Sequence, residues 1–415
     1  MTFSSHINPI QSRFWLAMSL FALVVSIGCD STQTKIPAKL TLQPADAEGS
    51  SASGQPNISV EEAEAFAKAW EDCIKAGDGK ASSELVSWVG IAKRTIEPFK
   101  VDANFRKGFI GGATTSIGPS FVDQMKKIVD SEGGSYKLAK VISRGGKRHV
   151  VFRMVDPNTG LNYHDFQLER AGGKVQASHL FVATTGEEFA DTIRGLVAPA
   201  IASSNSTFGR MSGEQKKQLE AIERLKEMKE AWAAGHRAKG NAIFKSLPTE
   251  TQNSKVVLLL KMQNMDIEKD ETEYLETIDL YAKLFPGDAS LGLITLDAAY
   301  LRKDLEMLEE SRSIIQGWTG GDPFIDLLVG GLLVTLDKVD EAVELTKDID
   351  PAPLGLADAH DYKMTIALAN KDHQTVLKEL RVLRDKFGYQ FSEFGGVEGY
   401  EGFVDSPEHS EWLKD

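Results

Sequence analysis

The hydrophobic and polar positions of the chain follow a helical period at first and change to a strand period near residue 135. Before that point, apolar residues recur at spacings of three and four, which is typical of helices with one buried face. A first helix is predicted to begin after a Ser59 cap and to end at Gly77 and Gly79. Its buried face would carry Ala63, Phe66, Ala67, Trp70 and Ile74.

Two further helices are predicted before the period changes, a short one over 81–90 and a longer one over 118–134. The glycine-rich segment 111–120 between them lacks the Gly-Lys-Ser/Thr ending of a phosphate-binding loop and does not follow a clear strand. We therefore interpret 111–120 as a turn.

Strict alternation then predicts four consecutive antiparallel strands over 136–144, 147–155, 161–170 and 174–185, separated by GG, DPNTG and GG. A two-residue turn at Gly172 and Gly173 would pair Ala171 with Lys174, Leu168 with Ala177, and Phe166 with His179. The face covered by helices would then consist of Val150, Phe152, Met154, His164, Phe166, Leu168, Val175, Ala177, His179 and Phe181. The opposite, polar face would hold Tyr163, Asp165, Gln167, Glu169, Gln176 and Ser178. One apolar and one polar face predict helices on a single side of the sheet.

Helices followed by a four-stranded meander resemble the α+β fold of nuclear transport factor 2-like (NTF2-like) and cystatin-like domains, over about 60–200. The resemblance implies a cavity between helices and sheet that often holds a ligand or an active site. The residues expected to line it are Trp70, Trp88, Met154, His164, His179 and Phe181. The two histidines could act as acid and base or bind a metal ion. Because no Cys, Asp or Glu shares their face, we favour hydrogen-bonded core histidines, with no catalytic residue, metal or cofactor.

The later half of the chain repeats helix pairs. Short polar connectors recur at Lys269, Lys303, Lys338 and Lys371, at intervals of 34, 35 and 33 residues. Such a period with two helices per unit is typical of tetratricopeptide repeats (TPR). The unit 324–351 resembles that family in its small residues twelve positions apart, Gly330 and Ala342, and in its closing Pro351.

Each helix pair has two apolar stripes, so neighbouring pairs must stack, and we expect an all-α solenoid with an open inner surface. The resemblance implies that this surface binds a protein or peptide. The candidate contacts are Asp297, Tyr300, Asp326, Asp361 and Lys363, although ordinary solvated positions remain the alternative. The first repeat helix is predicted to start at a capping box of Ser212 and Gln215. An aromatic tail is expected to cap the last repeat through Phe391, Phe394, Tyr400, Phe403 and Trp412.

The N-terminus carries the pattern of an export signal, Arg13 followed by fifteen uncharged residues that end just before Cys29. It resembles the signals of bacterial lipoproteins, which implies cleavage before Cys29 and lipidation of that residue. Ser26 departs from the large aliphatic residue usual in that family, so an ordinary signal or a short uncleaved anchor stays open. The predicted organisation is a signal peptide over 1–28, a disordered tether over 29–58, an α+β domain over 59–200, repeats over 211–388 and a cap over 389–415.

Charge is distributed unevenly. From Met211 onward there are 39 acidic and 24 basic residues, whereas residues 1–210 hold 23 basic and 21 acidic ones. An acidic half without a basic stripe argues against nucleic-acid binding and favours a basic partner segment. The second cysteine, Cys73, shares the apolar stripe of the first helix and is expected to be buried.

These patterns predict a non-enzymatic scaffold that is exported, anchored on the periplasmic or cell-surface side of a membrane, and bound to another protein. The alternative is a small-molecule or lipid carrier that uses the NTF2-like pocket, and an enzyme comes third. An enclosed apolar pocket beside Trp70, Trp88 and Phe181 would favour the carrier, whereas a filled sheet face would favour the scaffold.

Overall fold

The computed structural model describes residues 57–204 and 224–415, except for the single positions 100, 158, 233, 266 and 392. The predicted signal peptide, Cys29, nearly all of the tether and the Ser212–Gln215 capping box lie outside the described residues. Two compact units emerge from the internal contacts, one ending at Ile294 and one running from Thr295 to Asp415. No described helix is long and apolar enough to cross a membrane.

The first unit contains an antiparallel sheet with the strand order β1-β2-β3-β4-β5. Its strands are β1 (Ser135–Arg144), β2 (Lys147–Asp156), β3 (Gly160–Ala171), β4 (Lys174–Val182) and β5 (Glu187–Glu188). The predicted four-stranded meander is confirmed, and the two-residue β5 adds an edge that the sequence did not reveal. With its helices, this unit is an α+β structure.

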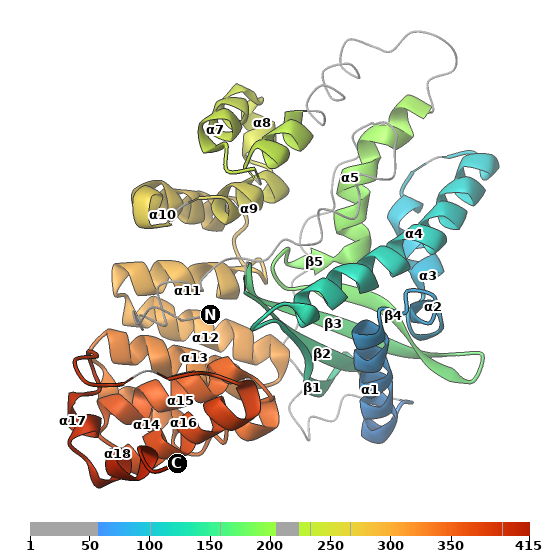
Figure 1. The fold of residues 1–415 in the computed structure, drawn as a ribbon. Helices are drawn as coiled ribbons and strands as arrows, with labels where there is room; N and C mark the ends of the chain where they lie inside the picture. Colours follow the sequence, from blue (N-terminus) through green and yellow to red (C-terminus); the bar gives the residue numbers. More distant parts are fainter. Residues whose placement is uncertain are drawn as a thin grey trace. The chain divides into compact units, whose positions relative to one another are not determined.

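Helices pack against one face of this sheet (Figure 1). They are α1 (Val60–Ala76), α2 (Ser82–Leu85), α3 (Trp88–Ile96), α4 (Ala103–Asp130) and α5 (Phe189–Ser204). The predicted start of α1 is confirmed, because Ser59 and Glu62 form a reciprocal capping box. Its end is confirmed as well, since Gly77 adopts a left-handed conformation at φ 72°. All five residues predicted for the buried face of α1 are buried.

Two predictions about the segments before the sheet were wrong, one of a helix and one of a turn. The predicted helix over 81–90 is divided into α2 and α3 by Val86, which forms a bridge to Ala177 in the sheet. The segment 111–120 is not a turn but the middle of α4, with Pro119 inside the helix. Glycine disfavours a helix locally, but at 118 it has a packing role, because a Cβ atom there would lie only 2.5 Å from the indole Nε1 of Trp88.

The predicted pairing of Phe166 with His179 was also wrong. Ala171 pairs with Lys174 and Leu168 with Ala177 as predicted, but the register shifts at Gln167/Leu168, and Phe166 pairs with Leu180. An irregularity of this kind turns the following residues to the opposite face of the sheet. Leu180 and Val182 therefore join the core beneath the helices, and His179 and Phe181 do not.

Beyond the sheet the described chain is helical. The first unit continues with α7 (Arg237–Ser246), α8 (Thr249–Gln252), α9 (Lys255–Gln263) and α10 (Ile267–Leu284). The division between the units falls inside α11 (Leu291–Arg302). The second unit continues with α12 (Leu305–Thr319), α13 (Pro323–Thr335), α14 (Val339–Thr346), α15 (Ala357–Ala369), α16 (His373–Phe387), α17 (Glu401–Val404) and α18 (Pro407–Trp412).

The helix pairs of the second unit reverse direction through the same backbone conformation. Lys303, Asp337 and Lys371 have φ values of 54°, 61° and 59°, and each lies 34 residues from the next. Left-handed non-glycine residues are uncommon, so their recurrence at this interval reflects repetition of the whole hairpin. The predicted connectors near Lys303, Lys338 and Lys371 are confirmed as chain reversals. The one predicted at Lys269 corresponds to a non-helical residue, Asp270, within α10.

Neighbouring pairs contact one another closely. The helix α13 packs against its own partner α14 and against α15 of the next pair. A Cβ atom on Gly330 would lie 2.8 Å from both Thr346 Cγ2 and Ile366 Cδ1, so only glycine permits this crossing without rearrangement. At the end of the unit, Phe394, Tyr400 and Phe403 form a buried cluster with residues of α15 and α16.

Candidate functional site

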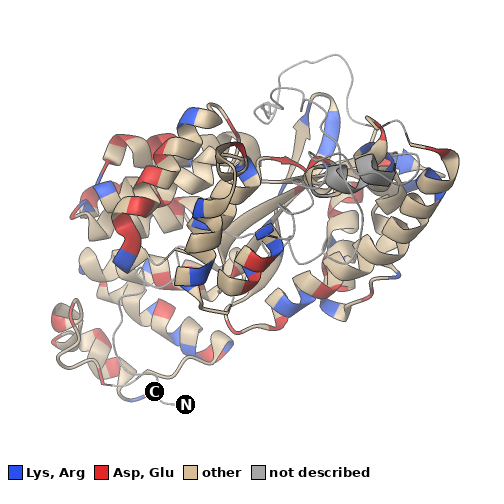
Figure 2. Ribbon diagram, turned by 90° about the horizontal axis from the view of Figure 1, so that it is seen from above, with Lys and Arg blue, Asp and Glu red and all other residues tan. Residues whose placement is uncertain are grey.

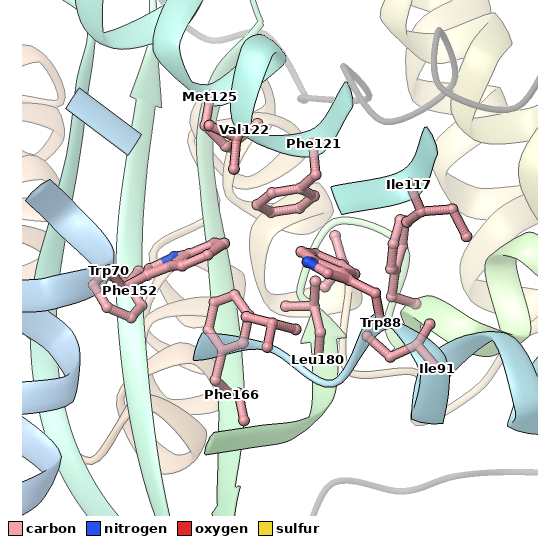
Figure 3. Packing of buried hydrophobic residues seen from close by; sticks show 14 of the residues in the cluster. Trp70, Trp88, Ile91, Ile117, Phe121, Val122, Met125, Phe152, Phe166 and Leu180 are labelled. Carbon is pink, nitrogen blue, oxygen red and sulfur yellow. The ribbon is translucent and has the colours of Figure 1, made fainter. Parts of the chain in front are cut away.

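The predicted ligand pocket of the α+β part is occupied by aromatic side chains. Figure 3 shows Trp70 and Trp88 on either side of Phe121, with Phe166 beneath them. The ring centroids of Trp70 lie 6.0 Å from Phe121 and 5.4 Å from Phe166, and those of Trp88 and Phe121 are 5.6 Å apart. Met154 belongs to the same buried cluster. These distances are those of rings in direct contact. The candidates Trp70, Trp88 and Met154 are therefore part of a packed core at the place where a ligand was expected.

His164 lies in this interior and is held by hydrogen bonds. Trp70 Nε1 donates to the Tyr136 hydroxyl at 3.3 Å, and that hydroxyl lies 3.1 Å from His164 Nδ1. The other ring nitrogen, Nε2, is 3.4 Å from Asn162 Nδ2. Burial lowers the pKa of His164 to about 3, so the imidazole is neutral near pH 7. His164 is thus a hydrogen-bonded core histidine without the pKa of an acid–base catalyst.

Charged residues gather on the opposite face of the sheet. Asp165 accepts hydrogen bonds from Arg144 and, at 2.8 Å, from His149 Nδ1. Burial alone would raise the pKa of Asp165, but His149 and Arg144 outweigh it and lower the pKa. Sequence reasoning placed Asp165 on the polar face but did not nominate it as a site residue. The available signal was the placement of Arg144, His149 and Asp165 on one face of neighbouring strands.

Other titratable residues lie near Asp165 at the β4–β5 edge. Burial, and next the charge of Asp165, raise the pKa of Glu188 to about 7. Burial, and next the charge of Arg94, lower the pKa of His179 to about 4. Phe181 stands between β3 and β5, paired with both Asp165 and Glu188. The candidates His179 and Phe181 therefore belong to this charged face, apart from Trp70 and Trp88.

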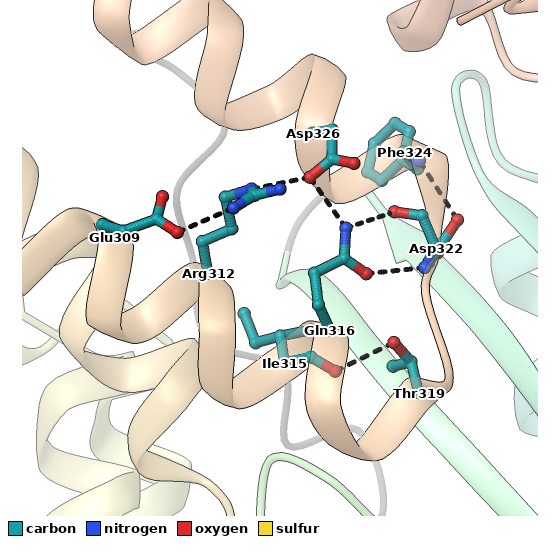
Figure 4. Close-up of polar contacts among 8 residues, drawn as sticks. All are labelled: Glu309, Arg312, Ile315, Gln316, Thr319, Asp322, Phe324 and Asp326. Carbon is teal, nitrogen blue, oxygen red and sulfur yellow. Dashed lines mark hydrogen bonds and ion pairs between the residues drawn. The ribbon is translucent and has the colours of Figure 1, made fainter. Parts of the chain in front are cut away.

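The candidate partner contacts in the helices mostly serve the chain itself. Asp326 Oδ1 accepts from Arg312 Nε at 2.7 Å and from Gln316 Nε2 at 2.8 Å, which joins α13 to α12 (Figure 4). Lys363 Nζ donates to the Thr346 carbonyl at 2.6 Å, and burial lowers the pKa of its ammonium group. Asp297 is only 5% exposed. Tyr300 and Asp361 are partly exposed and also take part in interactions within the chain.

A small polar notch between α7, α9 and α10 was not nominated by the sequence. It is open to solvent and has room for about one water molecule. Its lining residues are Arg237, Asn241, Lys261, Asn264, Met265, Asp270 and Glu273. The only sequence signal was the predicted helix break at Lys269, which lies beside the non-helical Asp270.

Within 57–204 and 224–415, no group of three His, Cys, Asp or Glu residues is placed to hold a metal ion. Cys73 is buried, and burial raises the pKa of its thiol to about 11, which disfavours the reactive thiolate. No protein-family model, curated protein or solved structure matches the chain. Its function therefore has to be inferred from these residues and their geometry.

Proposed function

We propose that the chain is an exported, membrane-tethered scaffold that binds another protein through its helical repeats and has no catalytic role of its own. The observation that carries the proposal is the recurrence of one backbone reversal every 34 residues, at Lys303, Asp337 and Lys371. Together with Gly330 opposite Ala342 and Thr346, this recurrence supports a tetratricopeptide-like solenoid.

A repeat array of this kind is suited to binding protein, because each hairpin contacts only its neighbours and leaves an extended surface. The contacts of α13 with α14 and α15 follow that pattern. The order of elements in the α+β part supports an NTF2-like domain. Its aromatic interior, however, weighs against the alternative of a small-molecule or lipid carrier, since the rings of Trp70, Trp88 and Phe121 occupy the expected pocket.

The charge of the repeats favours a basic partner. Residues 295–415 include 25 acidic and 12 basic residues. Figure 2 shows acidic residues in red along the helices. Glu306 and Glu310 on α12 are exposed, and Glu341 on α14 is exposed with Lys338 Nζ 3.8 Å from its Oε1, so these carboxylates face solvent where a partner could meet them. Attraction of this kind acts mainly on the association rate and on specificity, and added salt weakens it.

Affinity capture with the full-length, membrane-extracted protein tests the proposal. A variant carrying Glu306→Lys, Glu310→Lys and Glu341→Lys should lose at least tenfold in affinity for the captured partner, with a weaker dependence on salt. Glu64→Lys, Glu97→Lys and Glu132→Lys together, at three exposed positions in the α+β part, make the same change in net charge; this variant is the matched control and should bind as the native chain does. Equal binding by all three proteins would contradict an acidic docking surface, and capture of no partner would contradict the scaffold.

The proposed membrane tether is tested separately. Cys29→Ser should move the exported protein from the membrane fraction to the soluble fraction if Cys29 carries lipid. Retention of the variant in the membrane would support the short uncleaved anchor instead.

A further inference from the structure

We propose that the contact between the β4–β5 turn and residues 288–290 is a pH-sensitive latch, which holds when Glu187 is protonated and loosens when Glu187 is ionised. The latch lies wholly within the first unit, before Ile294. It joins the edge of the sheet to the segment that connects α10 with α11. A latch of this kind would regulate the chain whatever partner the repeats bind.

The two segments meet at a glycine. Gly186 has a φ of 60°, and a Cβ atom there would overlap Asp288 Oδ1 and would lie 3.0 Å from the main-chain nitrogen of Ser290. The main chain of the turn therefore touches Asp288 directly. A larger residue at position 186 would separate the two segments or strain the backbone.

On the helical side, Asp288 is the centre of a hydrogen-bonded network. Its Oδ1 accepts from the main-chain nitrogen of Ser290 at 2.9 Å and from the Ser290 hydroxyl at 2.6 Å. Its Oδ2 lies 2.6 Å from Nζ of Lys255, the first residue of α9, and both side chains are 15% exposed. The hydroxyl of the fully buried Tyr281, on α10, lies 2.8 Å from Ser290 Oγ. The network thus fixes the surface that the β4–β5 turn meets.

On the sheet side, Glu187 brings a second carboxylate to the same place. Its Oε1 accepts from the Thr192 hydroxyl of α5 at 2.8 Å. Burial raises the pKa of Glu187 above the usual 4.5, and the charges of Asp191 and Asp288 raise it further. Lys255 and the hydrogen bond from Thr192 lower the pKa, but they do not outweigh burial. In the closed latch Glu187 therefore retains its proton more readily than a carboxyl group in water.

The latch is suited to release because the apolar core of the α+β part does not extend into it. Among the described residues, that core runs from Ile58 to Val197 and includes no residue of α7–α11. Release would expose Glu187 to water and return its pKa towards 4.5, so the open state binds fewer protons than the closed one. The closed state is therefore favoured below pH 4.5 and loses stability as the pH rises through the raised pKa.

Hydrogen exchange of the full-length protein from about pH 4 to pH 8, corrected for the intrinsic exchange rate, tests the latch. Protection of segments 184–190 and 286–292 should fall together as the pH rises, by up to about tenfold per pH unit. The central strands β2 and β3 are the internal reference and should not show this fall. Protection that does not change with pH, or that falls equally in β2 and β3, would overturn the proposal.

Glu187→Gln can still accept the hydrogen bond from Thr192 but cannot ionise, so it should abolish the pH dependence and leave both segments protected at pH 8. Glu188→Gln is the matched control. Burial also raises the pKa of Glu188, to about 7, but the charges beside it include those of Asp165 and Arg94. The native pH response should persist in this control. A response that survives Glu187→Gln, or that disappears in Glu188→Gln instead, would contradict the assignment to Glu187.

The contact at Gly186 can be tested without any change of charge. Gly186→Ala should lower the protection of 286–292 at every pH, because the new methyl group would overlap Asp288. Gly172→Ala, in the β3–β4 turn, is the matched control, since its φ of 57° imposes similar backbone strain but the added methyl group would meet open space. Should Gly186→Ala fail to fold, Glu187→Gln, which adds no bulk, keeps the latch testable. Full protection of 286–292 in a folded Gly186→Ala variant would overturn it.

Discussion

The α+β part and the repeat unit use their side chains in opposite ways. Residues 57–204 hold 19 basic and 18 acidic residues and enclose an aromatic core, whereas residues 295–415 are strongly acidic and stack helix pairs. In the α+β part even charged groups such as Asp165 are buried with partners. In the repeats much of the charge, including Glu306 and Glu310, stays exposed. The difference is that the α+β part pairs buried charge within its own fold, whereas the repeat unit leaves much of its charge at the surface, which is why the proposed binding surface is placed on the repeats.

The largest effect expected from this comparison lies in the aromatic core. Trp70→Ala should lower the free energy of unfolding of the α+β part by about 3–5 kcal/mol, because it empties a fully buried site among packed rings. Urea denaturation followed by circular dichroism measures the loss. Val60→Ala, at a 41% exposed position of the same helix, should change it by less than about 0.5 kcal/mol. A small effect at Trp70 would indicate room inside the core and revive the carrier.

The second-largest expected effect is a loss of stability of the α+β part at acidic pH. His164 has an ordinary pKa when unfolded and a pKa of about 3 when folded, so the unfolded state binds the extra proton as the pH falls below about 6.5. Stability should then fall by up to about 1.4 kcal/mol per pH unit down to about pH 3. His164→Gln should flatten that slope between pH 6 and 4, as measured by urea midpoints. An unchanged slope would show that other groups dominate the acid response.

Two glycines of the second unit, Gly330 and Gly317, test how closely its helix pairs pack. Gly330→Ala should destabilise the second unit by about 1–3 kcal/mol, because the new methyl group would meet Thr346 and Ile366. Gly317→Ala lies in α12 with open space around it and should stabilise the unit by about 0.5–1 kcal/mol. Hydrogen exchange resolved along the chain would report both changes. Identical responses would argue against close stacking of the pairs.

The smallest expected effect concerns Glu188. Its pKa of about 7 when folded exceeds the value of about 4.5 when unfolded, so the folded state retains a proton and loses relative stability as the pH rises from 4.5 to 7. Glu188→Gln should stabilise the α+β part by about 1 kcal/mol at pH 8, a figure reduced for partial exposure, and by almost nothing at pH 5. Thermal melts at both pH values measure the difference, and an equal shift at both would contradict the role of ionisation.

Local sequence patterns predicted both ends of α1, the order of the first four strands and the interval between the chain reversals of the second unit. Ser59 with Glu62, the Gly172–Gly173 turn and the reversals near Lys303 and Lys371 each depend on a few adjacent residues. Such features follow from backbone chemistry alone, which is why the pattern revealed them.

What the sequence could not predict depends on distant packing. The irregularity at Gln167/Leu168 moved His179 out of the expected pocket, and nothing in the alternation of residues marks it. The place of Gly118 inside α4 is explained by the Trp88 ring beside it, a contact from another helix that the local sequence does not reveal. The notch likewise requires Asn241, Lys261 and Glu273 from three separate helices.

The shared reversals at Lys303, Asp337 and Lys371 also bear on how such a chain can change length. Loss or gain of one residue within a helix would rotate every later side chain by about 100° and spoil the fit to the next hairpin. Addition or removal of a whole module would preserve that fit. The array can therefore grow or shrink by duplication and deletion, which would alter its reach while its local joints stay the same.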